Sequence, residues 1–185
     1  MIIPRVAIQC AHCKEQGISS FAWIDAVNIM SISARDAHRH NPERFSDQCK
    51  GFFIIAQEGM FNGIPNMELE DIEKWAKVIQ TVALEAPFDT DVYINLCSDM
   101  DSSKPIGYDD LMEAYEGSFK SFVDFAKYYY DYIREDIPRF FYDHIDWKSI
   151  SHELERKGLF YYYKNPGFPS EVHVFSNAYL REYYK

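Results

Sequence analysis

The pattern of apolar and polar positions predicts a small α/β unit at the start of the chain. Apolar runs at residues 6–9 and 20–24 indicate two strands of a hairpin, with Gly17 in the connecting turn region. A short helix is expected over 31–39, and the compact apolar run 51–56 is typical of a third, buried strand. The first part of the chain should therefore combine a hairpin, one more strand and a helix.

The middle of the chain has the pattern of an amphipathic helix. Apolar side chains recur at spacings of three and four over residues 67–85, which places them on one buried stripe. Acidic residues crowd the first two turns, where the helix dipole favours anions. Pro87 ends this helix, and the polar residues 98–107 indicate a loop.

Helices are expected to resume at residue 108. Asp109 and Asp110 open a helix that Gly117 breaks, and a second helix follows over 118–132. The apolar side chains of that second helix form one stripe, which leaves acidic side chains such as Asp124 facing solvent.

The end of the chain combines a helix with a hairpin. An amphipathic helix is expected over 145–157, closed by Gly158, and the aromatic runs 159–163 and 171–175 indicate two paired strands. The predicted fold is α+β, an elongated chain of three small domains. They are an N-terminal α/β hairpin unit over 1–65, a central, mainly helical domain over 66–107, and a C-terminal α+β domain over 108–185.

Composition identifies a globular chain and excludes a membrane span in the sequence. Apolar residues make up 47% and charged residues 26%, which are ordinary values for a folded domain. No run of about 18 uncharged apolar residues occurs, and the first residues lack the pattern of a signal peptide. We therefore expect a cytoplasmic protein without a membrane partner.

The net charge of −10 is concentrated in the middle of the chain. Residues 67–146 hold 19 acidic and 7 basic side chains, whereas residues 1–66 hold six of each. The aromatic residues of this segment allow it to fold while its carboxylates remain at the surface. Such a chain repels nucleic acid and attracts proteins that bind nucleic acid, so we expect no direct binding of nucleic acid.

Four cysteines raise the question of a metal site. Cys10 and Cys13 have the C-x-x-C spacing of zinc and redox sites, and His38, His40 and Cys49 could in principle complete a tetrahedral set. There is no second C-x-x-C pair, and the histidines fall in a polar run. We therefore expect free thiols, no bound metal and no cofactor.

Signatures of catalysis are largely missing. The sequence contains no P-loop, G-x-G-x-x-G, H-E-x-x-H or G-x-S-x-G motif, so an enzyme is not expected. A metal-dependent hydrolase remains a minor alternative. Its candidate residues are Asp143, His144, Asp146, His152, Glu153 and His173.

The order of motifs along the chain resembles the ArdA family of antirestriction proteins. The N-terminal motifs are Gly17-Ile18, Trp23-Ile24-Asp25-Ala26, Glu58-Gly59 and the acidic helix after Ile64-Pro65. The C-terminal motifs are LMEAYEGSFKSFVDFA at 111–126, Tyr142-Asp143, Trp147, Leu154, Gly158 and VHVFSN at 172–177. The resemblance spans roughly residues 5–177.

The resemblance implies a function without catalysis. Members of that family are dimers whose surface carboxylates imitate the phosphates of bent B-form DNA. They occupy the DNA-binding site of type I restriction-modification enzymes and protect incoming plasmid or phage DNA in the bacterial cytoplasm. For this chain it implies a homodimer that binds the DNA-recognition and methyltransferase core of such an enzyme. An inhibitor of another DNA-handling complex, such as a CRISPR effector or a transcription regulator, is the main alternative.

The predicted DNA-mimic surface consists of acidic residues from the middle segment. They are Glu70, Asp71, Glu73, Asp99, Asp101, Asp109, Asp110, Glu113, Glu116, Asp124, Asp131, Glu135 and Asp136.

Overall fold

The chain forms two compact units, which are described separately. The computed structural model describes residues 3–59, 67–100, 102, 104–133, 138–165 and 168–183. By their internal contacts, the units are Met1–Glu85 and Ala86–Lys185. Helices and two small antiparallel sheets confirm the α+β class. The division into three domains stays a prediction; the central helices fall on both sides of the observed boundary. No helix among the described residues is long and apolar enough to cross a membrane.

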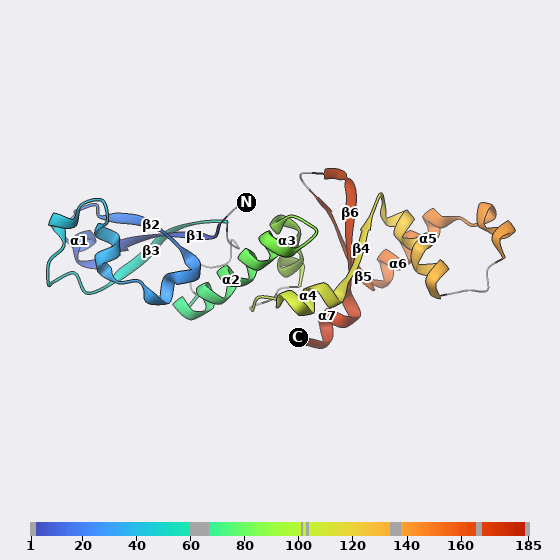
Figure 1. The fold of residues 1–185 in the computed structure, drawn as a ribbon. Helices are drawn as coiled ribbons and strands as arrows, with labels where there is room; N and C mark the ends of the chain where they lie inside the picture. The colour runs from blue at the N-terminus through green and yellow to red at the C-terminus, as the bar shows by residue number, and fades with distance from the viewer. Residues whose placement is uncertain are drawn as a thin grey trace. The chain divides into compact units, whose positions relative to one another are not determined.

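The N-terminal unit is built on a three-stranded sheet whose central strand is β1 (Arg5–Cys10) (Figure 1). β2 (Phe21–Asp25) and β3 (Phe52–Glu58) flank it, both antiparallel. The expected pairing of the first two strands is confirmed. Their connection contains a short helix, α1 (Ala11–Glu15), and Gly17 follows it with a φ of +71°, which glycine adopts without strain.

β3 is an edge strand, so the prediction of a buried strand is wrong. It pairs only with β1, and its side chains alternate in burial, leaving Phe53 and Ile55 48% and 46% exposed. A continuous apolar run fits a strand covered on both faces, but here the apolar residues on one face of the edge strand remain exposed.

Outside the sheet, the described part of this unit is mainly helical. α2 (Leu69–Glu85) buries Ile72, Trp75, Ile79 and Val82 and packs against the 3-10 helix η1 (Ala26–Ser31). The single helix expected over 31–39 is instead a second 3-10 helix, η2 (Ala34–His38). η2 begins with a capping box, in which the side chains of Ser33 and Asp36 satisfy the first backbone groups. A third, η3 (Pro42–Arg44), precedes β3.

The C-terminal unit contains a sheet with the order β4-β6-β5. The predicted hairpin is confirmed as β5 (Phe160–Asn165) and β6 (Phe168–Ser176), with Tyr162 opposite Val174. β4 (Tyr115–Phe119) pairs with the other edge of β6. The two helices expected on either side of Gly117 are present, but this glycine lies inside a strand that the sequence did not predict, with a φ of +130°.

Six helical segments surround this sheet. They are α3 (Thr90–Asp99), α4 (Tyr108–Ala114), α5 (Phe122–Ile133), η4 (Arg139–His144), α6 (Trp147–Lys157) and α7 (Asn177–Tyr183), among the described residues. Figure 1 shows α3 and α5 on opposite sides of the sheet. Phe125, Val172 and Val174 form a buried cluster on the α5 side. α6 ends as predicted at Gly158, whose φ of +59° is the left-handed conformation of a helix C-cap.

Candidate functional site

The predicted acidic residues are divided between the two units. Glu70, Asp71 and Glu73 lie on α2 of the N-terminal unit, and the other described residues of the set belong to the C-terminal unit. Asp101, Glu135 and Asp136 lie outside the described residues. The two groups of carboxylates are therefore considered separately.

Lysines on the same helix offset the charge of the α2 carboxylates. Lys74 Nζ lies 2.8 Å from Glu70 and 3.6 Å from Asp71, and Lys77 Nζ lies 3.0 Å from Glu73. The hydrogen bond from Lys74 lowers the pKa of Glu70. The spacings of three and four residues are those at which side chains meet on a helix surface. The two lysines therefore offset two of the three negative charges.

Tyrosine hydroxyls hold three of the predicted carboxylates in the C-terminal unit. The pairs are Tyr163 with Asp99 and Tyr179 with Glu113, each with an O···O distance of 2.7 Å, and Tyr142 with Asp131. The tyrosines come from β5, α7 and η4, 11 to 66 residues from their partners in sequence. A phenol is a neutral donor, so it fixes a carboxylate without cancelling its negative charge.

The same arrangement occurs at an acid that the sequence did not single out. Tyr162 on β5 donates to Glu155 on α6, and this hydrogen bond lowers the pKa of Glu155. Burial and the hydrogen bond to Asp99 raise the pKa of Tyr163, which keeps that phenol protonated. No spacing rule connects these residues, because sheet topology brings them together.

The remaining predicted carboxylates have mixed surroundings. Asp109 is exposed and Asp110 half-buried in the first turn of α4. Partial burial raises the pKa of Glu116 on β4, so this group is less readily ionised than the others. Asp124 accepts a hydrogen bond of 2.6 Å from Ser121 and lies 3.7 Å from Lys127. It therefore helps to begin α5 and contributes less free negative charge.

Three cysteines and a histidine meet at one end of the N-terminal sheet. Cys10 ends β1, Cys13 lies in α1, His38 ends η2, and Cys49 lies in the loop before β3. All four side chains are buried, and their ligand atoms lie within 4.8 Å of one another. The fold therefore brings His38 and Cys49, two of the three residues that the sequence offered as further ligands, to the C-x-x-C pair. His40, the other histidine considered, is exposed.

Hydrogen bonds fix the orientation of the histidine ring. Ser20 Oγ donates to the backbone carbonyl of Ala37 at 3.1 Å and lies 3.0 Å from His38 Nδ1. A hydroxyl has a single proton, so its oxygen accepts from Nδ1–H. The neutral ring then carries its lone pair on Nε2, which lies 3.7 Å from Cys13 Sγ.

The three thiols differ in acidity. Burial, and then the neighbouring Cys10 and Cys49, raise the pKa of Cys13 to about 11. A backbone hydrogen bond from Ser46 lowers the pKa of Cys49. The neighbouring thiols thus oppose ionisation of Cys13, and a bound cation would counteract this effect.

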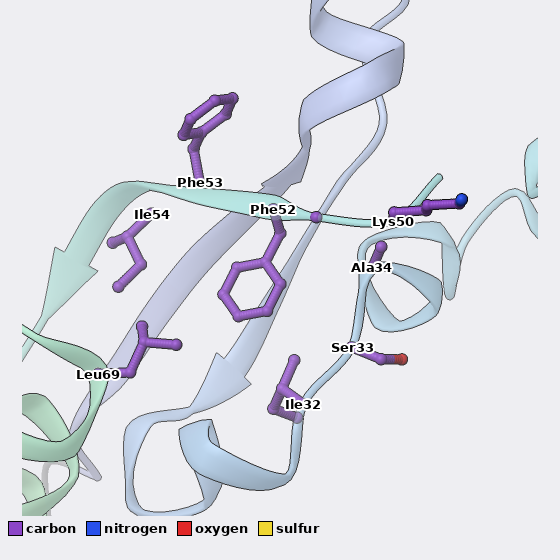
Figure 2. Close-up of a pocket in the computed structure, with 9 residues that line it drawn as sticks. Ile32, Ser33, Ala34, Lys50, Phe52, Phe53, Ile54 and Leu69 are labelled. Atoms are coloured by element: carbon purple, nitrogen blue, oxygen red, sulfur yellow. The ribbon is translucent and has the colours of Figure 1, made fainter. Parts of the chain in front are cut away.

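A pocket of about 580 Å³ lies beside the same sheet (Figure 2). Figure 2 shows Phe52, Ile54, Ile32 and Leu69 around it, with Lys50 at its edge. Its nine lining residues include no cysteine, histidine or carboxylate. Its polar lining side chains are those of Lys50 and Ser33, and the Ser33 hydroxyl donates to Asp36 in the capping box of η2.

Three of the six residues named for the hydrolase alternative are engaged in structural contacts. Asp146 caps α6 by accepting from the backbone N–H of Ser149, and Glu153 pairs with Arg156 at 2.7 Å. His173 is buried on β6, where its Nδ1 lies 2.9 Å from the Tyr115 hydroxyl and burial lowers its pKa. Within the described ranges, Cys10, Cys13, His38 and Cys49 are the residues grouped closely enough to hold a metal ion.

Two comparisons bear on the family of the chain. No protein-family model matches it, and no curated protein matches it.

Proposed function

We propose that the protein is an antirestriction protein that imitates B-form DNA and occupies the DNA-binding site of a type I restriction-modification enzyme. The observation that carries this proposal is the set of carboxylates held by tyrosines in the C-terminal unit, at Asp99, Glu113 and Asp131. The resemblance to the ArdA family supplies the class of target.

Tyrosine donors suit a phosphate mimic better than lysine donors. A lysine partner would fix a carboxylate but would also neutralise it, as on α2. A phenol fixes the position and leaves the full negative charge for the partner's Lys and Arg side chains. Fixing the carboxylates before binding also reduces the side-chain entropy that is lost in the complex.

The distribution of charge supports the C-terminal unit as the binding surface. Residues 89–131 contain ten acidic and three basic side chains. An excess of this kind steers a basic DNA-binding groove towards the protein and opposes contact with DNA itself. Glu70, Asp71 and Glu73 then contribute less, because Lys74 and Lys77 offset them.

The test is inhibition of DNA methylation and cleavage by a type I enzyme. The informative variant combines Asp109→Asn, Glu113→Gln and Glu116→Gln, which removes three negative charges from α4 and β4. We expect about tenfold weaker inhibition, since exposed charge pairs contribute about 0.2–1 kcal/mol each and tenfold corresponds to about 1.4 kcal/mol. Thermal stability should change little because these groups are away from the cores.

A matched variant controls for the change in net charge. Glu15→Gln, Glu43→Gln and Glu58→Gln remove three exposed carboxylates from the N-terminal unit, outside the predicted surface. This control should inhibit as the original protein does, and excess duplex DNA should relieve inhibition by both. Inhibition that DNA does not relieve would contradict the proposal. Tight binding to a CRISPR effector or a transcription regulator, with no effect on type I enzymes, would assign the surface to that other target.

A further inference from the structure

We propose that Cys10, Cys13, His38 and Cys49 bind one structural Zn²⁺ ion that holds the N-terminal unit together. This inference is independent of the proposed function, since it concerns the other unit and a different set of side chains. It rests on the proximity of four buried ligand atoms from four separate segments.

The spacing of the ligand atoms matches a tetrahedral zinc site. Bond lengths of about 2.3 Å to sulfur and about 2.0 Å to nitrogen place two tetrahedral ligands about 3.6 Å apart. The distance between Cys13 Sγ and His38 Nε2 is 3.7 Å. The remaining ligand atoms lie within 4.8 Å of one another, so small side-chain movements would close the site around an ion.

The surroundings of His38 provide a second, independent observation. Because Ser20 accepts from Nδ1, the lone pair of Nε2 is directed at the thiols before any metal arrives. A metal-bound histidine commonly donates its other ring N–H to an oxygen in this way, which fixes the tautomer and the ring orientation. A histidine buried only for packing would not need its lone pair beside three sulfur atoms.

The donor set favours zinc in a structural role. Three thiolates and one imidazole are soft and borderline ligands, and zinc accepts them in a four-coordinate tetrahedral site. All four positions would be filled by protein, so no position remains for water or substrate. Zinc binding would release the thiol protons. Forming the thiolate of Cys13 is unfavourable in the metal-free protein because its pKa is raised, and the cation would offset this cost by pairing with the thiolate.

Zinc would stabilise the least regular part of this unit. Residues 26–51 form three 3-10 helices and turns rather than long helices or strands. The cluster joins this segment to the end of β1 and to α1, through His38 and Cys49. A metal that binds the folded state alone contributes its binding free energy to folding.

The first experiment measures metal in the wild-type protein, purified under reducing conditions and supplied with Zn²⁺. We expect one zinc per chain by elemental analysis. X-ray absorption should give three sulfur ligands at about 2.3 Å and one nitrogen ligand at about 2.0 Å. Cobalt in its place should show the absorption of a tetrahedral thiolate site. Absence of stoichiometric zinc, or a shell of oxygen ligands, would overturn the proposal.

Variants identify the ligands. Cys49→Ser and Cys10→Ser should each lose the bound zinc, whereas Cys97→Ser should retain it. Cys97 is the matched control, because it is also a buried free thiol but lies on α3 in the other unit. Equal zinc content in Cys49→Ser and Cys97→Ser would contradict the assignment.

Chelation of the wild-type protein tests the structural role even if the variants fold poorly. Removal of zinc should increase amide hydrogen exchange over residues 5–58 by at least tenfold and change exchange over 86–183 much less. Unchanged exchange would exclude a structural role. Mass spectrometry that finds a disulfide among these cysteines in freshly purified, metal-free protein would indicate a redox site in place of a zinc site.

Discussion

The hydroxyl of Ser20 determines which ring nitrogen of His38 faces the three thiols. It is 2% exposed, and both of its hydrogen bonds are internal, to Ala37 and to His38. Its role is that of a positioning residue, because it would not touch a bound metal ion. Partners of this kind commonly contribute 10- to 100-fold to metal affinity.

Ser20→Ala should therefore weaken zinc binding by roughly 10- to 100-fold while still allowing one zinc per chain at saturation. Competition with a chromophoric chelator measures both the affinity and the stoichiometry. Ser31→Ala is the control, because this exposed serine bonds to Asn28 away from the cluster. Equal affinities in the two variants would show that Ser20 does not orient the ligand.

At this scale the sequence offered all four residues of the cluster, with His40 as a further candidate, but did not select among them. The C-x-x-C pair is visible from spacing alone, but His38 and Cys49 follow Cys13 by 25 and 36 residues. His40 is an equally good candidate in the sequence, because nothing in the polar run indicates which of the two histidines becomes buried. That choice is made by η2, which turns His38 inward and leaves His40 exposed.

At the scale of elements, β4 is the feature that local pattern could not predict. Phe119, Phe122 and Ala126 have helical spacing, which extended the expected helix across the boundary between β4 and α5. The strand forms because Tyr115–Phe119 pairs with β6, more than 50 residues away. By contrast, α2, α6 and the β5–β6 hairpin depend on local periodicity and turn residues, and these were predicted.

Tyrosines of β5 and α7 hold carboxylates on α3 and α4. Combining Tyr163→Phe with Tyr179→Phe releases Asp99 and Glu113 without changing the charge of the protein. We expect about five- to 150-fold weaker inhibition of a type I enzyme, because the two freed side chains must then be ordered on binding at about 0.5–1.5 kcal/mol each and tenfold corresponds to about 1.4 kcal/mol.

Tyr161→Phe on the same strand is the matched control, since no described contact has its hydroxyl as a hydrogen-bond donor. Its inhibition should equal that of the original protein, as measured by methylation of a plasmid substrate. If releasing Asp99 and Glu113 leaves inhibition unchanged, the tyrosines serve stability alone and the carboxylates act without being positioned.

At the scale of the whole chain, composition predicted the amount of charge and its place in sequence but not its local balance. The net charge of −10 comes mainly from residues 67–146. Lysines offset the carboxylates of α2, whereas tyrosines hold those at Asp99 and Glu113. Whether an acid keeps its charge available depends on partners from other elements, which a residue count does not include.

Carboxylates whose charge is not offset by a lysine should make binding to the enzyme depend on the salt concentration. Exposed carboxylates that meet Lys and Arg side chains are screened over about 8–10 Å at physiological ionic strength, so affinity should fall as salt rises. The slope of log affinity against log salt should be shallower than for duplex DNA. A folded protein lacks the condensed counterions whose release favours DNA binding. Titrations at several salt concentrations, with the same enzyme and both ligands, measure the two slopes.

The variant with Asp109, Glu113 and Glu116 neutralised should give a slope shallower still, and the control with Glu15, Glu43 and Glu58 neutralised should keep the original slope. Affinity that does not depend on salt, or equal slopes for the two variants, would show that this acidic surface does not contact the enzyme.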